Sequence, residues 1–222
     1  MTASPRISPL EPPYTPEVAE HLKGSMPSWA KLEPLALFRT WARHLPLGAA
    51  LRPIGRLVLS EGTLEPRERE ILILRVCARC EAEYEWGVHA VSYPQRLGIE
   101  PDTVRATLEA AADDPVWSPR EALLVRLADE LHDTSRVSGE LWRELAAGWS
   151  QEQLLELLLV TGFYHAVAFT VNGLELPLEP WAARFPSQPG RCGLERANGP
   201  DVSPEGSVRK SRGVKGKTAP PR

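Results

Sequence analysis

Several marks of common protein classes are missing from this sequence of 222 residues. It contains only three cysteines, Cys77, Cys80 and Cys192, and so small and odd a number excludes a disulfide framework. It has no P-loop, no Gly-x-Gly-x-x-Gly segment and no nucleophile elbow, so nothing predicts a nucleotide site or an α/β-hydrolase. Its first residues lack a basic segment followed by an apolar run, and we therefore expect a cytoplasmic protein.

Aromatic residues are also scarce, at 7% of the chain, and residues 187–222 contain none. This segment has five prolines and six glycines and cannot bury enough apolar surface to offset its ordering entropy, so we predict a disordered tail. Residues 1–17 hold another five of the 22 prolines and are predicted to form an N-terminal arm. Residues 18–186 remain for one domain, which excludes a collagen-like, mucin-like or wholly disordered chain.

The net charge of −3 is divided unevenly along the chain. The tail carries eight basic and three acidic residues, or about +5, and the remainder therefore carries about −8. The basic residues of the tail are dispersed, and the tail has no aromatic side chain on which a nucleobase could stack. We therefore do not expect specific nucleic-acid binding. Residues 154–171 are apolar enough to approach the length of a membrane span, but Glu156, His165 and Thr170 interrupt them. We predict a buried helix that also contacts a second subunit, and no membrane association.

The middle of the chain is predicted to be all helical, because no segment shows sustained alternation of apolar and polar residues. Ser118 and Ser150 each begin a capping box, and Pro66, Pro101 and Pro119 stand at first helical positions. Pro94 should end or kink a helix near Ser92. The similar starts at Pro66 and Pro119 are explained either by a duplicated helical unit or by the general way in which helices begin. Helices are predicted over 32–44, 47–60, 66–80, 83–97, 101–113, 118–133, 138–148 and 150–174.

The residues most suggestive of chemistry lie between 66 and 98. Glu85 and His89 are four residues apart on a predicted helix and therefore share a face. A carboxylate beside an imidazole fixes its tautomer and raises its pKa, which suits proton transfer near neutral pH. The same spacing also describes a structural pair of modest energy, so the spacing alone leaves both interpretations open.

These residues resemble the carboxymuconolactone decarboxylase family, which also contains the AhpD-type alkylhydroperoxidases. The resemblance rests on Arg-Glu-Arg at 67–69, the apolar helix that follows, Glu85-x-x-x-His89 and Leu97-Gly98. It is strongest over 64–98 and extends loosely to about 175. It implies an AhpD-like helical bundle that forms a homo-oligomer, often a trimer or hexamer, with active sites near subunit contacts.

The two branches of this family differ around the histidine. The hydroperoxidase branch has a Cys-x-x-Cys pair whose second cysteine lies four residues before the histidine, and this chain has Ala82 and Glu85 at those places. Glu70 falls where that branch has its proton-relay glutamate. The decarboxylase branch has a glutamate four residues before the histidine, as Glu85 is here. The immediate neighbourhood of His89 therefore resembles the decarboxylase branch.

Cys77 and Cys80 form a Cys-x-x-Cys pair five residues upstream of the family position. They lie near the end of a predicted helix, where the helix dipole opposes thiolate formation, whereas Arg75 and Arg79 favour it. Small residues at this spacing on an apolar helix are also typical of core packing. A redox role for this pair is therefore an alternative hypothesis.

A smaller group of polar residues stands on the last helix: Tyr164, His165 and Asn172. They either line the same pocket as His89 or bond to backbone at a subunit contact. His21, His44 and His132 are isolated in sequence, and no group of residues has metal-ligand spacing, so we predict no metal site.

The leading hypothesis is a lyase without a cofactor that decarboxylates a small carboxylated substrate. His89 is expected to act as general acid and base, Glu85 to orient it, and Glu70 to relay protons. Arg67 or Arg75 is expected to bind the substrate carboxylate, with further contacts from Tyr84, Trp86, Tyr164 and His165. The alternatives are an AhpD-like hydroperoxide reductase of peroxiredoxin type that uses Cys77 and Cys80, and a non-enzymatic oligomer that binds a small ligand.

Overall fold

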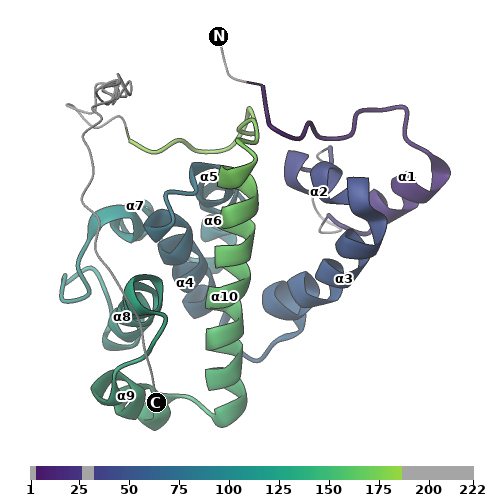
Figure 1. Ribbon diagram of the computed structural model, residues 1–222. Coiled ribbons are helices and arrows are strands. Elements are labelled where there is room, and N and C mark those ends of the chain that lie inside the picture. The colour runs from purple at the N-terminus through teal and green to yellow at the C-terminus, as the bar shows by residue number, and fades with distance from the viewer. Residues whose placement is uncertain (1–3, 27–32, 187–222) are drawn as a thin grey trace, which may run out of the picture. The chain divides into compact units, whose positions relative to one another are not determined.

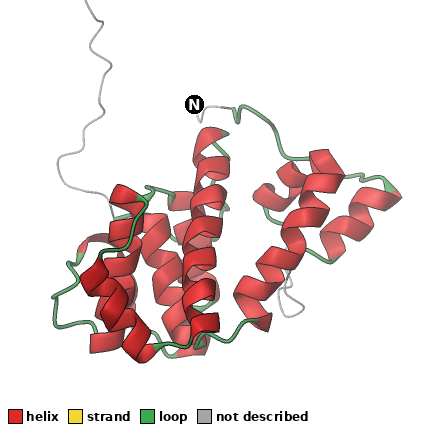
Figure 2. Cartoon of the chain, turned by 60° about the horizontal axis from the view of Figure 1, so that its bottom comes forward, coloured by secondary structure: helices red, strands yellow, loops and turns green. Residues whose placement is uncertain are grey.

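The computed structural model describes residues 4–26 and 33–186, and every regular element in these residues is helical (Figures 1 and 2). The all-α prediction is therefore confirmed. One compact unit extends to Phe185, and the tail predicted over 187–222 lies outside the described residues. The helices are α1 (Pro16–Lys23), α2 (Ala36–Trp41), α3 (Leu45–Arg56), α4 (Pro66–Arg79), α5 (Glu83–Ser92), α6 (Pro94–Leu97), α7 (Pro101–Glu109), α8 (Pro119–Thr134), α9 (Gly139–Gly148) and α10 (Gln151–Gly173). Two short irregular turns, η1 (Ala42–His44, 3₁₀) and η2 (Leu57–Glu61, π-helical), flank α3.

Helix α4 is the centre of the hydrophobic core. Every residue from Ile71 to Leu74, together with Val76 and Cys77, is completely buried. Helices α5, α7, α8 and α10 pack around α4 and cover all its sides. This explains why α4 is apolar nearly all round and has no polar face after its first turn. A polar side chain attached to α4 beyond that turn must therefore find its partner inside the protein.

The predicted starts of α4, α7, α8 and α10 are confirmed. Ser118 and Ser150 each accept a hydrogen bond from the third residue of their helix, whose side chain bonds back to the serine N–H. Prolines occupy the first positions of α4, α7 and α8. Because a proline there loses no intrahelical hydrogen bond, these residues support the helices rather than break them.

The residues around Pro94 end one helix and begin another. Helix α5 ends at Ser92, since the residue before a proline is disfavoured in a helix, and Pro94 then begins the single turn of α6. Gly98 ends α6 with φ +62°, a conformation that suits glycine. The helix predicted over 83–97 is thus two helices, with the break at the predicted place.

Other boundaries differ from the prediction. Helix α1 was missed, although Thr15 caps it and Pro16 begins it, because the proline content of residues 1–17 indicated an irregular arm. Its residues Val18 and Leu22 bury themselves against Ala42 in a small separate cluster. The helix predicted over 101–113 ends at Glu109, and the one predicted over 47–60 is α3 followed by η2.

Helices α4 and α8, which begin with similar sequences, pack directly against each other. Arg67 pairs with Glu121, Arg75 with Asp129 and Arg79 with Asp133. Each pair is separated by 54 residues, and a constant separation means that the two helices run in parallel. The similar starts therefore belong to helices that pack as neighbours.

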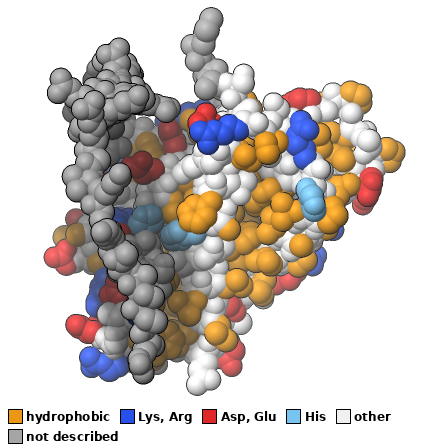
Figure 3. Space-filling view, in the orientation of Figure 1, with side chains coloured by type: hydrophobic (Ala, Val, Ile, Leu, Met, Phe, Trp, Pro, Cys, Tyr) orange, Lys and Arg blue, Asp and Glu red, His pale blue; other side chains and the backbone are white. Residues whose placement is uncertain are grey.

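Helix α10 is the segment considered above as a membrane span. It passes that test by length and composition, with 44% of its most apolar window buried inside the protein. Val160, Tyr164 and Val167 contribute to the core, whereas Leu155 and Phe169 are each 69% exposed. Figure 3 shows that hydrophobic side chains gather on the face where α10 lies beside α3. Helix α10 thus serves as a core helix with a second apolar face at the surface.

Candidate functional site

Three helices bring polar side chains together around His89. His89 and Glu85 come from α5, four residues apart, as the sequence predicted. Glu70 comes from the middle of α4, and Tyr164 from the middle of α10. All four are buried, with at most 6% of any of them exposed. The structure therefore joins the predicted pair to Glu70 and also to Tyr164.

Both nitrogens of His89 have partners. Nδ1 lies 2.7 Å from Oε1 of Glu70, the shortest contact of the imidazole. Nε2 lies 3.1 Å from the hydroxyl of Tyr164 and 3.4 Å from Oε1 of Glu85. The orienting carboxylate is consequently Glu70, whereas Glu85 approaches the other nitrogen, on the side of Tyr164. Tyr93 stacks on the ring at a centroid distance of 4.9 Å and fixes its plane.

The charge on His89 follows from these neighbours. Burial by itself lowers the pKa of His89, but the carboxylates of Glu70 and Glu85 outweigh it and raise the pKa to about 10. His89 is thus an imidazolium at neutral pH. One oxygen of each carboxylate, Oε2 of Glu70 and Oε2 of Glu85, is buried without a hydrogen-bond partner. A buried oxygen without a hydrogen-bond partner lowers the stability of the folded protein, so a purely structural role does not explain it. Its presence here favours a role in proton transfer.

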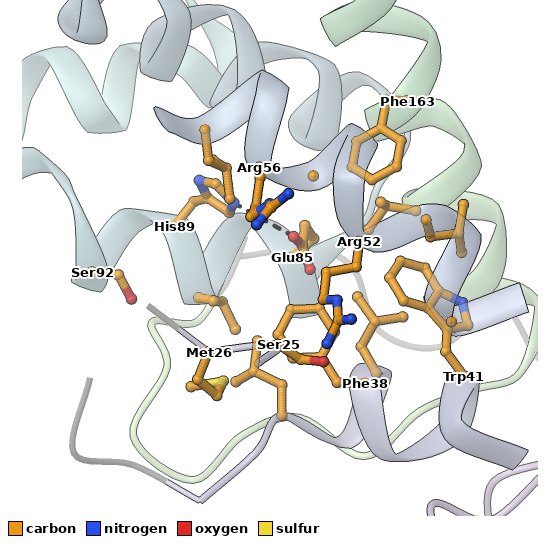
Figure 4. A pocket seen from close by; sticks show the side chains of 18 of the residues that line it. Ser25, Met26, Phe38, Trp41, Arg52, Arg56, Glu85, His89, Ser92 and Phe163 are labelled. Atoms are coloured by element: carbon orange, nitrogen blue, oxygen red, sulfur yellow. Dashed lines mark ion pairs between the residues drawn. The ribbon is translucent and has the colours of Figure 1, made fainter. Parts of the chain in front are cut away.

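A cavity of about 370 Å³ opens beside this group (Figure 4). Glu85, His89 and Tyr164 line one side of it. The remaining wall is largely apolar and comes from α1, α2, α3 and α10 and from Trp181. Arg52 and Arg56 lie on the α3 side, and His21 and Ser25 lie near the end of α1. The cavity is therefore an apolar pocket with an acid–base group in one wall and arginines in another.

Arg52 and Arg56 were not predicted as site residues. They are four residues apart on α3, so they share one face of a helix that is otherwise mostly apolar. That spacing was visible in the sequence, but nothing in the sequence indicated that this face would turn toward His89.

The arginines that the sequence favoured lie elsewhere. Arg75 is buried between α4 and α8, where two of its three guanidinium nitrogens donate to the two oxygens of Asp129. Arg67 donates to Glu121 and to the carbonyl of Gly98. Neither lines the cavity. Both arginines therefore have structural partners, and neither is placed to contact a substrate in the cavity.

The aromatic residues beside Glu85 also point away from the cavity. The hydroxyl of Tyr84 donates to Glu179 at 2.6 Å and accepts from the N–H of Leu37. The indole N–H of Trp86 donates to Thr107 at 3.0 Å. Of the aromatic residues predicted to contact a substrate, Tyr164 alone lines this cavity.

The polar residues of α10 divide between two places. Tyr164 faces His89, whereas His165 faces His132 on α8, with Nε2 of His165 3.3 Å from Nδ1 of His132. Asn172 donates to the carbonyl of Cys80 at 2.8 Å. His132, which is isolated in the sequence, is therefore paired in the structure. Cys80 joins the two histidines in a group whose ligand atoms could hold a metal ion.

The two cysteines of the Cys-x-x-Cys pair do not line the cavity. Cys77 is completely buried, and burial raises the pKa of its thiol well above the ordinary value. Cys80 is half-buried, and burial raises the pKa of its thiol to about 11. Because a thiolate is the reactive form, neither cysteine is prepared for attack on a peroxide in this cavity.

No protein-family model and no curated protein matches the sequence. Solved structures do match the fold. A peroxidase-related protein from Silicibacter sp. TM1040 has a TM-score of 0.68 at 16% identity, over 81% of this chain and 96% of that chain. An alkylhydroperoxidase AhpD core protein from Ralstonia eutropha JMP134 has a TM-score of 0.66 at 16% identity, over 80% and 95%. A debrominase, Bmp8, in complex with 2,3,4-tribromopyrrole, has a TM-score of 0.69 at 14% identity, over 82% and 95%. The chain therefore has the AhpD-like helical fold.

Proposed function

We propose that the protein is an acid–base enzyme that decarboxylates a small carboxylated substrate in the cavity beside His89. One observation carries the proposal: Glu85 and His89 line a largely apolar cavity while Glu70 holds the far side of the imidazole. A purely structural ion pair does not require a cavity beside its charged groups. The resemblance of residues 64–98 to the decarboxylase branch supports the same conclusion.

The chemistry needs a proton donor near a carbon atom. When the bond from the carboxylate to its neighbouring carbon breaks, CO₂ leaves and the electron pair remains on that carbon as a carbanion or dienolate. The imidazolium of His89 can deliver a proton to the carbon from Nε2, which faces Tyr164 and Glu85. Glu85, with one unpaired oxygen, can then return a proton from water to Nε2. Glu70 is a positioning residue, because it contacts only Nδ1.

The substrate carboxylate is assigned to Arg52 and Arg56. A guanidinium binds a carboxylate through two parallel hydrogen bonds, and both arginines line the cavity that the acid–base group also lines; Arg56 in addition lies 3.6 Å from Glu61. The apolar wall, which includes Phe38, Trp41 and Phe163, would exclude water from the developing carbanion. Arg52 and Arg56 thus replace Arg67 and Arg75 as the proposed carboxylate-binding residues.

The test is a decarboxylation assay on a panel of small carboxylated lactones and β-keto acids, followed by NMR in buffered D₂O. We expect CO₂ release from at least one compound and incorporation of deuterium at the vacated carbon. His89→Asn should reduce turnover about 100-fold or more, since general acid–base catalysis contributes about 10²–10⁴. Glu100→Gln, at the exposed start of α7, is the matched control and should keep full activity. No CO₂ release from the panel contradicts the reaction, and full turnover by His89→Asn contradicts the role of His89.

The other hypotheses make different predictions. A hydroperoxide reductase needs Cys77 and Cys80 to form a disulfide, so peroxide treatment should protect both thiols from alkylation; the burial of Cys77 weighs against this. A binding protein without catalysis would retain the panel compounds unchanged. The cytoplasmic location and the homo-oligomer remain predictions, and light scattering on the purified protein measures the subunit number.

A further inference from the structure

From the geometry we infer a second site, separate from the cavity: a zinc site formed by Cys80, His132 and His165. Cys80 caps the C-terminal end of α4, His132 lies near the end of α8, and His165 lies in the middle of α10. None of the three lines the cavity beside His89. They are separated by 52 and 33 residues in the sequence, which is why no metal motif was visible there.

The distances between the ligand atoms fit a tetrahedral zinc ion. Sγ of Cys80 lies 3.7 Å from Nδ1 of His132, and this Nδ1 lies 3.3 Å from Nε2 of His165. All three atoms lie within 4.8 Å of one another. Zinc bonds of about 2.3 Å to sulfur and about 2.0–2.1 Å to nitrogen, at tetrahedral angles, separate sulfur from nitrogen by roughly 3.6 Å and two nitrogens by roughly 3.3 Å. The two observed distances agree with this arrangement before any movement of the side chains.

The surroundings orient the ligands. Nδ1 of His165 lies 2.9 Å from the carbonyl oxygen of Thr161, so Nδ1 carries the proton and Nε2 directs its lone pair toward Cys80 and His132. A hydrogen bond of this kind on the far nitrogen is the usual support of a zinc-binding histidine. Asn172 of α10 donates to the carbonyl of Cys80 and ties the end of α4 to α10. The backbone of one ligand and the ring of another are thus fixed independently of the metal.

The electrostatics permit a cation. Arg79, the nearest basic residue in sequence, pairs with Asp129 and Asp133 on α8, and these two carboxylates offset its positive charge in part. Cys80, His132 and His165 are each partly exposed, so an ion can reach them from solvent. On binding, Zn²⁺ displaces the proton of the Cys80 thiol, which is released to the solvent, and the two imidazoles remain neutral.

The ligand set and its spacing together favour zinc. One thiolate with two imidazoles binds zinc or copper, the tetrahedral spacing described above suits zinc, and three protein ligands leave a fourth position for water or a small anion. Since the ligands come from three different helices, the bound ion would stabilise the packing of the end of α4 against α8 and α10. This role is independent of the reaction proposed for the cavity.

The experiment uses the full-length chain without an affinity tag, stripped with a chelator and titrated with Co²⁺ and then Zn²⁺. We expect one equivalent of Co²⁺ to bind with a thiolate charge-transfer band and the intense visible bands of a tetrahedral site. Zn²⁺ should displace the cobalt and raise the melting temperature of the protein. Absence of the thiolate band from the unmodified chain overturns the inference, whatever the variants do.

Variants then assign the ligands. Cys80→Ser should abolish the thiolate band, and His132→Gln and His165→Gln should each weaken Co²⁺ binding at least about 100-fold. The matched controls are Cys77→Ala and Cys192→Ser for the cysteines, and His44→Asn, which keeps a capping side chain at the start of α3, for the histidines. All three controls should bind as the unmodified chain does. If either cysteine control loses the band, or if either histidine variant keeps full affinity, the site is not the one inferred.

Discussion

Nδ1 of His89 lies 2.7 Å from Oε1 of Glu70, which is fully buried and nineteen residues earlier in the chain. This contact decides the chemical character of the site. It fixes the edge of the imidazole that carries Nδ1, so that Nε2, on the opposite edge, faces Tyr164 and Glu85. It also makes His89 a cation at neutral pH, because a second carboxylate stands on the other side.

The raised pKa of His89 predicts how stability depends on pH. The folded-state pKa is about 10 and the unfolded value is 6.5, so the stabilisation from protonated His89 is complete below pH 6.5 and declines as the pH rises toward 10. We expect the free energy of unfolding to fall steadily between pH 6.5 and 8.5. Urea denaturation at a series of pH values measures it. Glu70→Gln should flatten the decline, and an equally steep decline in this variant would contradict the assignment.

The ion pair of Glu70 and His89 is expected to show strong energetic coupling. His89→Gln leaves the carboxylates of Glu70 and Glu85 buried without a cation and should cost about 3 kcal/mol or more, whereas Glu70→Gln leaves His89 paired with Glu85 and should cost less. The double variant should cost less than the sum of the two by at least about 1 kcal/mol. Urea denaturation of the four proteins at pH 6 completes this cycle. Simple additivity would show that the two side chains do not interact.

Arg52 and Arg56 are expected to select carboxylated ligands. Arg52→Ala should weaken the binding of a small carboxylate to the cavity about 10-fold to 100-fold, because a charged hydrogen bond contributes about 1.5–3 kcal/mol. The corresponding amide should bind weakly to both proteins. Isothermal titration calorimetry measures these affinities, with Arg105→Ala on the exposed side of α7 as the control. Equal affinities for Arg52→Ala and the control would exclude Arg52 from the site.

Two glycines should respond in opposite ways to alanine. A methyl group on Gly87 of α5 would meet the backbone carbonyl of Ala183, which the chain cannot easily move, so Gly87→Ala should destabilise the protein by about 1–3 kcal/mol. A methyl group on Gly162 of α10 meets nothing within 4 Å, and Gly162→Ala should stabilise it by about 1 kcal/mol. Thermal unfolding followed by circular dichroism measures both changes. A neutral Gly87→Ala would show that residues 182–185 do not pack closely against α5.

Much of the fold could be predicted from local sequence. The starts of α4, α7, α8 and α10 follow from prolines and capping serines that act within one helical turn. The shared face of Glu85 and His89 follows from helical spacing alone. Helix α1 is not predicted by the proline content of residues 1–17, although Thr15 and Pro16 form a local helix start.

The partners of these side chains could not be predicted in this way. The sequence by itself determined that the segments from α4 to α10 are helical and that His89 would lie beside a carboxylate. Only the packing of α3, α4, α5, α8 and α10 decided that Glu70 orients His89, that Arg52 rather than Arg75 faces the cavity, and that His132 meets His165 and Cys80. The physical reason is range: helical periodicity fixes neighbours three and four residues apart, whereas contacts between helices depend on how whole apolar faces pack together.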